Sequence, residues 1–121
     1  MKKTNERIKK ITIQLVIDAG KILEKKYLKI KNITNKLNAG IVTEADKLSE
    51  TFIIKKLEKC FPSSSILSEE VGNIKKADEM KWIIDPLDGT TNFAHGFPWF
   101  NVTIALEQNG VVTHGVIYHP L

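Results

Sequence analysis

Asp85 and Asp88 stand directly behind the apolar run Trp82-Ile83-Ile84 and directly before Gly-Thr-Thr. The apolar run predicts a buried strand, and Pro86 fixes the turn that follows it. The two aspartates offer carboxylates, the backbone carbonyl of Leu87 between them offers a neutral oxygen, and two threonine hydroxyls follow. Oxygen ligands of this kind suit hard divalent cations such as Mg²⁺. The segment therefore indicates a site for phosphate chemistry assisted by a metal ion.

Glu69 is a third candidate ligand, because it follows another short apolar run, Ile66-Leu67. A strand that ends there could place Glu69 beside Asp85 on a neighbouring strand. Carboxylates held close together repel one another unless cations lie between them, so the grouping itself favours a metal site. Bound cations would polarise a phosphoryl group, lower the pKa of a bound water and stabilise the leaving oxygen.

Gly89 and Thr90 follow the second aspartate and could begin a short helical turn. The free backbone N–H groups of such a turn would face phosphate oxygens. The Thr90 hydroxyl could also hold an attacking water, with Glu69 as the acceptor of its proton. Structural interpretations stay open beside these, since Asp-Pro and Asp-Gly are common in turns and Glu69 with Glu70 could be a solvated acidic pair.

The spacing of the two aspartates separates two kinds of phosphatase. An apolar strand followed by Asp-x-Asp-Gly-Thr would indicate a haloacid-dehalogenase-type phosphatase, in which the first aspartate is a nucleophile. The spacing from residue 85 onward is Asp-x-x-Asp-Gly-Thr. The additional residue turns the second carboxylate in another direction, because side chains along a strand alternate. This spacing disfavours the nucleophilic interpretation.

Two helices are predicted in the first half of the chain. Apolar residues at helical spacing predict an amphipathic helix over about residues 6–28, with Ile8, Ile11, Leu15, Ala19, Ile22 and Leu23 on its buried side. Thr43-Glu44-Ala45-Asp46 fits a capping box that opens a second helix, although Thr43 and Asp46 could serve the cap alone or a site as well. Phe61-Pro62 ends this helix. Its predicted buried stripe is Leu48, Phe52, Ile53, Leu57 and Cys60.

Strands dominate the second half. Residues 102–106 and 112–118 alternate in polarity around Asn109-Gly110, which predicts a β-hairpin. The stretch 32–40 has no sustained period and is interpreted as a loop before a short strand at 41–42, and the lysine-rich stretch 71–81 is interpreted as a mobile loop. Two helices followed by several strands favour an α+β fold, with the helices on one face of a largely antiparallel sheet.

Composition sets the general class. The chain has 121 residues, 42% hydrophobic and 26% charged, which fits one globular domain. The net charge of +4 comes from lysines spread along the chain, and without aromatic interleaving they indicate solvated helix surface rather than a nucleic-acid partner. The single cysteine, Cys60, excludes an internal disulfide and fits a reducing compartment. Without a signal peptide or a stretch long enough to span a bilayer, we expect a cytoplasmic protein with no membrane partner.

Several segments together resemble the inositol monophosphatase family. Residues 82–93 match the first signature of that family almost throughout, and Phe97-Pro98 follows where the family has it. Residues 42–46 resemble its Val-Thr-x-x-Asp segment, Ser68-Glu69-Glu70 its Gly-Glu-Glu segment, and residues 115–118 its Gly-Val-Val-Tyr strand. The order and approximate spacing agree along nearly the whole chain.

This resemblance implies a magnesium-dependent phosphomonoesterase that hydrolyses inositol monophosphate or a related small sugar phosphate. A metal-activated water would attack directly, without a phosphoenzyme. The implied metal ligands are Glu69, Asp85, the Leu87 carbonyl and Asp88. Thr90 and Glu69 would activate the water, and Asp46 would assist at a weaker third metal or its waters. The implied contacts to the substrate, a small phosphorylated alcohol or sugar, come from Gly89, Thr90 and Asp88.

The resemblance also implies the first half of the layered αβαβα fold of this family. Family members are considerably longer and commonly dimerise, so we expect residues 1–121 to be the N-terminal domain of a longer protein that forms a homodimer, with the second domain missing here. Ser68 replaces the usual glycine, and Gly40 and His119 stand where aspartates are common. Two alternatives stay open: a noncatalytic regulatory module associated with RNA or transcription, and an inactive truncated fragment.

Overall fold

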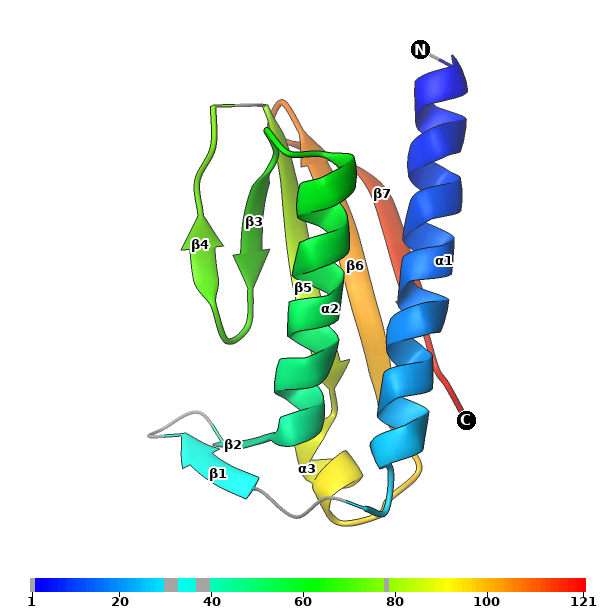
Figure 1. Ribbon diagram of the computed structural model, residues 1–121, viewed down its shortest axis with the longest axis vertical. Coiled ribbons are helices and arrows are strands. Elements are labelled where there is room, and N and C mark those ends of the chain that lie inside the picture. Colours follow the sequence, from blue (N-terminus) through cyan, green and yellow to red (C-terminus); the bar gives the residue numbers. More distant parts are fainter. Residues whose placement is uncertain (1, 30–32, 37–39, 78) are drawn as a thin grey trace.

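The computed structural model describes residues 2–29, 33–36, 40–77 and 79–121, and for residues 2, 33–36 and 40–42 it describes the backbone alone. Two long helices, a short helix and seven strands follow one another along this part of the chain (Figure 1). In chain order they are α1 Lys2–Lys26, β1 Ile33–Lys36, β2 Gly40–Thr43, α2 Glu44–Cys60, β3 Ser65–Ser68, β4 Gly72–Ile74, β5 Met80–Asp88, α3 Thr90–Ala94, β6 Asn101–Gln108 and β7 Val111–Tyr118.

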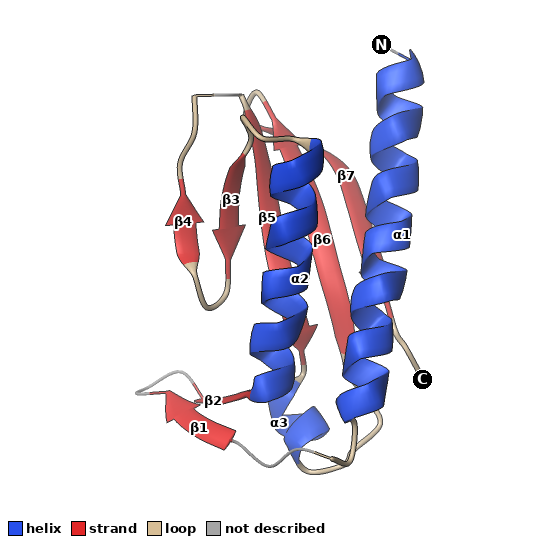
Figure 2. Ribbon diagram, viewed as in Figure 1, coloured by secondary structure: helices blue, strands red, loops and turns tan. Residues whose placement is uncertain are grey.

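A five-stranded sheet with the order β4-β3-β5-β6-β7 forms one layer of the molecule, behind the two long helices in Figure 2. Strands β3 and β5 run parallel, and the other neighbours in this sheet are antiparallel. Helices α1 and α2 pack against each other on one face, with α2 over β5 and α1 over β6 and β7. The predicted α+β fold, with two helices on a largely antiparallel sheet, is therefore confirmed.

The core lies between the two long helices and the sheet. Along β5 and β6 the buried residues alternate, because every second side chain of a strand points to the same face. Full burial of each such side chain stabilises the fold by about 1.5–3 kcal/mol relative to leaving it exposed. The largest fully buried side chains are Trp82, Phe93, Phe100, Ile8, Leu23, Ile53, Leu57, Ile66, Ile104 and Leu106.

Helix α1 is amphipathic as predicted, although it runs over Lys2–Lys26 rather than about 6–28 and buries Ile11 and Ile22 only partly. It buries Ile8, Leu15, Ala19 and Leu23 against the sheet and α2, and its exposed face carries lysines. Among the helices that the structure describes, none combines the length and the apolar character needed to cross a bilayer.

Helix α2 begins at the predicted capping box. Thr43 is the N-cap, and its hydroxyl oxygen accepts hydrogen bonds from the backbone N–H groups of Ala45 and Asp46 at 3.2 and 3.4 Å. In return the Asp46 carboxylate accepts a bond of 2.8 Å from the Thr43 backbone N–H. Phe61 is the C-cap, so both predicted ends of this helix are confirmed.

The predicted buried stripe of α2 is wrong in its N-terminal half. Leu48 is 43% exposed, whereas Ser49 and Glu50 are buried with Asp46 on the face that meets the strands. The helical period places residues 46, 49 and 50 on one side, so Leu48 must point elsewhere. The apolar pattern misled because these buried polar groups have hydrogen-bond partners on segments remote in sequence. Farther along, Ile53 and Leu57 are buried as predicted, while Phe52 and Cys60 are only partly buried.

Two stretches predicted as loops contain strands. Residues 33–36 form β1, which pairs antiparallel with β2, while residues 32 and 37–39 of the same stretch lie outside the described residues. Residues 72–74 form β4 at the edge of the large sheet, where they pair with β3. Both strands are short and polar, and their pairing comes from backbone hydrogen bonds that no side-chain pattern reports. The prediction of a mobile loop over 71–81 is wrong at β4 and at the start of β5.

The predicted hairpin is present as β6 and β7. Asn109 and Gly110 connect the strands with φ angles of 52° and 81°. Positive φ at both central residues is the requirement of the tight turn that matches the twist of a hairpin, and Asn-Gly meets it at little cost.

Candidate active site

Three segments lie in the lower half of the molecule in Figure 1: the N-terminus of α2, the end of β3, and farther down the end of β5 with α3 after it. Because β3 and β5 are parallel, their carboxyl ends lie at the same edge. Their register pairs Ser68 with Ile84. The next residue of each strand is an acid, so Glu69 and Asp85 lie at the same level of the sheet.

A bulge in β5 separates Asp85 from Asp88. Pairing with β6 joins Asp85 to Thr103 and resumes between Asp88 and Asn101, so three residue steps on β5 face two on β6. The bulge contains Pro86, which has no N–H to give to the ladder. It leaves Asp85 partly buried and Asp88 exposed, where Asp88 accepts a hydrogen bond of 3.2 Å from the Asn101 amide.

Several negative charges act on Asp85. Its pKa is raised to about 6, first by burial and then by the charges of Glu69, Asp88 and Asp46, in that order, while a hydrogen bond from the Leu87 backbone lowers it. The side chains therefore lie close enough to repel one another around Asp85. A cation bound among them would relieve that repulsion, and the donor set of hard oxygens is the one that Mg²⁺ prefers.

The metal ligands themselves stay a prediction. Among the residues that the structure describes, no group of three or more acidic, histidine or cysteine side chains lies close enough together to hold an ion. Repulsion between carboxylates favours such separation. What the fold brings together is the ends of β3 and β5, which carry Glu69, Asp85, Leu87 and Asp88.

Asp46 connects the helix cap to the end of β5. Its Oδ1 accepts a hydrogen bond of 2.8 Å from the Thr90 hydroxyl, and its Oδ2 accepts bonds from the backbone N–H and hydroxyl of Thr43. Burial raises the pKa of Asp46, the bonds from Thr43 and Thr90 lower it, and the charge of Glu70 adds to the rise. Asp46 thus caps the helix and also binds Thr90, a candidate site residue, while a role of Asp46 in catalysis stays a prediction.

The Thr90 hydroxyl lies between two acceptors. Besides Asp46 it reaches the Leu87 carbonyl oxygen at 3.1 Å. A hydroxyl has one proton and two lone pairs, so a Thr90 oxygen that donates to Asp46 can still accept a hydrogen bond from a third group. A water molecule in that position would have its lone pairs free for attack on another molecule.

Gly89 starts the short helix α3, as the sequence predicts. It is the N-cap in the left-handed region with φ of 91°, and its carbonyl accepts a hydrogen bond of 2.9 Å from the Phe93 backbone N–H. A Cβ atom at this position would lie 2.9 Å from the Trp99 carbonyl oxygen. Conformation and space therefore both require glycine. That its N–H and that of Thr90 bind phosphate stays a prediction.

We expect Gly89→Ala to destabilise the fold by about 1–3 kcal/mol, because a left-handed conformation strains any residue with a Cβ. The close approach to the Trp99 carbonyl adds to that cost. Gly110→Ala is the matched control, since Gly110 has φ of 81° but a Cβ added there would meet nothing within 4 Å. Urea unfolding of both variants measures the difference, and equal losses of stability would contradict the claim of close approach.

Two residues of α2 that the sequence analysis did not single out also reach the site segments. The Ser49 hydroxyl donates a hydrogen bond of 2.7 Å to the Pro86 carbonyl, inside the bulge of β5. Glu50 accepts hydrogen bonds from the last residue of β3 and from the turn that follows it. Their spacing of three and four residues from Asp46 was the available signal, because it places all three on one helix face.

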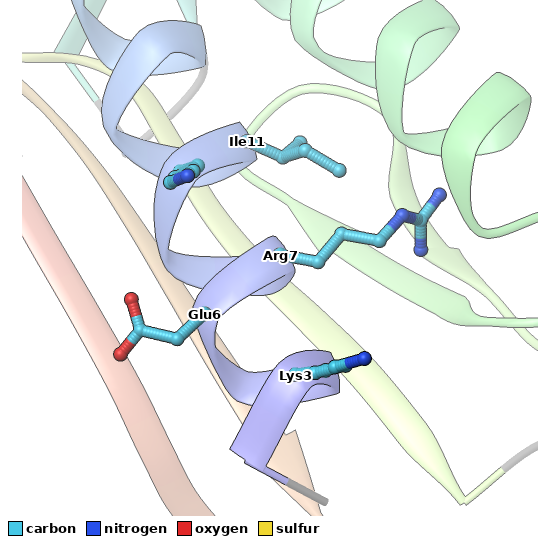
Figure 3. Close-up of a pocket in the computed structure, with 5 residues that line it drawn as sticks. Lys3, Glu6, Arg7 and Ile11 are labelled. Carbon is cyan, nitrogen blue, oxygen red and sulfur yellow. The ribbon is translucent and has the colours of Figure 1, made fainter.

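A separate pocket lies at the other end of α1. Its lining residues are Lys3, Glu6, Arg7, Lys10 and Ile11 (Figure 3). Arg7 extends toward α2, where its guanidinium lies 4.9 Å from the centre of the Phe61 ring and donates to the Cys60 carbonyl at 3.4 Å. The N-terminus of α1 lies at the top of the molecule in Figure 1, whereas α3, which follows the acidic residues of β5, lies at the bottom. The pocket is therefore no part of the candidate active site.

Comparison with known proteins points to one family. The sequence profile described as the inositol monophosphatase family matches residues 4–121. Inositol monophosphatase 3 of Solanum lycopersicum is 40% identical over 120 residues, which cover 96% of this chain and 45% of that protein. The Nus factor SuhB of Pasteurella multocida is 39% identical over 114 residues, which cover 92% of this chain and 43% of that protein.

The fold agrees with the sequence comparison. The crystal structure of the extragenic suppressor protein suhB from Bartonella henselae superposes with a TM-score of 0.89 at 38% identity, and the match covers 94% of this chain and 45% of that one. The chain thus spans less than half the length of these relatives, while each match covers more than nine-tenths of this chain.

Proposed function

The chain belongs to the inositol monophosphatase family. From that premise we propose that the protein acts as a magnesium-dependent phosphomonoesterase. The substrate would be inositol monophosphate or a related small sugar phosphate. The observation that carries the proposal is the group of negative charges around Asp85, placed beside the hydrogen-bonded pair of Asp46 and Thr90. The chain spans less than half the length of these relatives, so their activity by itself does not establish the activity of this chain.

The residues at the carboxyl ends of β3 and β5 would hold the metal. Carboxylates and a backbone carbonyl are hard oxygen ligands, and Mg²⁺ takes few of them together with water and substrate phosphate. The proposed ligands are Glu69, Asp85, the Leu87 carbonyl and Asp88. When bound, Mg²⁺ would polarise the phosphoryl oxygens and make a water more acidic.

The remaining groups would handle substrate and proton. Thr90, which donates to Asp46, can accept a hydrogen bond from the attacking water and so orient it. Glu69 would take a proton from that water as the water oxygen attacks phosphorus. The ester P–O bond would break, and the leaving oxygen would take a proton from solvent to form the alcohol. The backbone N–H groups of Gly89 and Thr90, with Asp88, would contact the phosphate of the substrate. No bond between enzyme and phosphorus is needed.

Removal of the metal tests the proposal directly. We expect phosphate release from inositol monophosphate by the protein at its full natural length to fall to background in EDTA and to return with added Mg²⁺. Phosphate release by the Asp88→Asn variant should stay at background with added Mg²⁺, because the substitution removes a proposed ligand. Asp18→Asn is the matched control, since Asp18 lies on α1 and pairs there with Lys21. Undiminished turnover in EDTA or in the Asp88 variant would reject the proposal.

The proposal also includes a cellular location. We place the protein in the cytoplasm, where the partly buried Cys60 would stay reduced. A small phosphorylated alcohol would meet the enzyme there without a membrane partner. Fractionation of cells that produce the protein tests this placement.

A second candidate function rests on a separate observation. One relative of similar identity is named as a Nus factor, and the pocket at the start of α1 carries Lys3, Arg7 and Lys10. A noncatalytic role with RNA would use such cations against phosphates, and its affinity would fall steeply with salt. Neutralising these three residues to glutamine should then reduce RNA binding and its salt dependence. RNA binding that is absent, or unchanged in this variant, excludes this candidate.

A further inference from the structure

The carboxyl ends of β3 and β5, which carry Glu69, Asp85 and Asp88, are called the acidic edge. One turn of α2 is hydrogen-bonded to each of the segments that form it. Asp46 binds Thr90 after β5, Ser49 binds the bulge within β5, and Glu50 binds the last residue of β3 and the turn after it. The first two contacts fix the end of β5 and the start of α3. The third contact acts on the connection that contains Glu69.

We propose that Glu50 is a positioning residue, which fixes the connection between β3 and β4 and thereby directs the Glu69 carboxylate toward Asp85. The inference rests on the proposed function, because Glu69 matters only if the acidic edge is the active site. Glu50 itself would touch neither substrate nor metal.

The contacts of Glu50 converge on one atom. Its side chain is 4% exposed, and Oε2 accepts hydrogen bonds from the Ser68 hydroxyl at 2.7 Å, the Glu70 backbone N–H at 2.9 Å and the Val71 backbone N–H at 3.1 Å. Hydrogen bonds to a carboxylate are stronger than those between neutral groups. The donors lie on both sides of Glu69 along the chain, so the position of Glu69 is determined from both directions.

The connection between β3 and β4 is short. Only residues 69–71 separate the end of one strand from the start of the other, and two of their three backbone N–H groups bind Glu50. Without that acceptor the turn could rotate about its backbone angles, and Glu69 would move with it. Strand pairing alone leaves this freedom, since it stops at Ser68 and Gly72.

Three substitutions separate positioning from general support of the fold. Glu50→Ala removes the acceptor, Glu50→Gln keeps one carbonyl oxygen that can replace Oε2, and Glu50→Asp keeps the charge but is one methylene too short to reach the turn. Glu58→Ala is the matched control, because Glu58 is an exposed glutamate on the same helix. Thermal unfolding first establishes which variants fold.

The readouts are chosen to report on Glu69. In the protein at its full natural length, hydrogen exchange at the amides of Glu70 and Val71 should accelerate in Glu50→Ala and Glu50→Asp and stay slow in Glu50→Gln. Calorimetric titration with Mg²⁺ alone should show affinity about 10–100-fold weaker in the first two variants, the usual effect of losing a group that orients a metal ligand. With saturating Mg²⁺, kcat should fall while KM for the phosphate ester is unchanged.

The outcomes are decisive in both directions. The inference is overturned if folded Glu50 variants have the same hydrogen-exchange rates at the two amides and the same Mg²⁺ affinity as Glu58→Ala. If Glu50→Ala does not fold, the other two variants decide. Slow amide exchange and normal Mg²⁺ affinity in Glu50→Gln, with fast exchange and weak affinity in Glu50→Asp, support the inference. Equal exchange and affinity in these two variants overturn it. Amide exchange and Mg²⁺ titration need no turnover, so they decide the role of Glu50 even where the wild-type protein hydrolyses no phosphate ester and the proposed function fails.

Discussion

Asp85→Asn should abolish Mg²⁺-dependent phosphate release while leaving the metal-free protein at least as stable as the wild type at neutral pH. The loss of activity should reach about a thousandfold, since a bound metal stabilises transition-state charge by several kcal/mol and each 1.4 kcal/mol is about a factor of ten. The gain or retention of stability follows from the charges around this residue, because asparagine keeps the size of the side chain without the repulsion from Glu69, Asp88 and Asp46.

The pKa shift of Asp85 fixes the direction of the pH dependence. Its pKa is raised from the usual 3.8 to about 6 in the folded protein, so the folded state binds this proton more tightly than the unfolded state does. The resulting stabilisation is complete below pH 3.8 and is lost as the pH rises through about 6. Because the side chain is only partly buried, solvent screening reduces the effect to about 1–2 kcal/mol.

Denaturant unfolding in EDTA measures this effect. The difference in free energy of unfolding between the wild type and Asp85→Asn should shift in favour of the variant by about 1–2 kcal/mol from about pH 4.5 to about pH 7.5. Asp18→Asn provides the baseline for loss of a surface carboxylate. Turnover retained by the Asp85 variant, or a clear loss of its metal-free stability at neutral pH, would contradict the account of the acidic edge.

Thr90→Val should lower kcat by about 10²–10⁴-fold, the usual contribution of a group that positions or moves a proton in the transition state. Valine has nearly the shape of threonine but lacks the hydroxyl that donates to Asp46 at 2.8 Å. Asp46 would then lose one of its hydrogen-bond donors in a buried place, which costs about 1–3 kcal/mol of stability. Thr90→Ser keeps the hydroxyl and should retain most of the activity.

The neighbouring threonine supplies the control. Thr91 is exposed one residue further along α3, so Thr91→Val changes the same chemistry at the same helix without touching Asp46. Initial rates at saturating Mg²⁺ compare the three variants, and unfolding curves separate loss of rate from loss of structure. Similar rates for Thr90→Val and the wild type, or an equal loss in Thr91→Val, would remove Thr90 from the mechanism.

Local features of the fold were predictable because their physics is local. The capping box of α2 satisfies hydrogen bonds within four residues, and Asn109-Gly110 supplies the positive φ angles of its own turn. The alternation of β6 reports one buried face of one strand. The grouping of Asp85 with Asp88 is likewise contained in a few consecutive residues, so its chemistry could be inferred before its geometry.

Tertiary structure decided which polar groups are buried and what they bind. Thr90 lies 44 residues from Asp46, and the turn that binds Glu50 lies 18 to 21 residues from it, so no periodicity connects them. For the same reason α2 buries Ser49 and Glu50 and exposes Leu48, against the rule that apolar side chains go inside. Burial of a polar group costs free energy unless the fold supplies a hydrogen-bond partner for it. Those partners come from β3 and β5, whose parallel register the sequence does not specify, and that register places Glu69 level with Asp85.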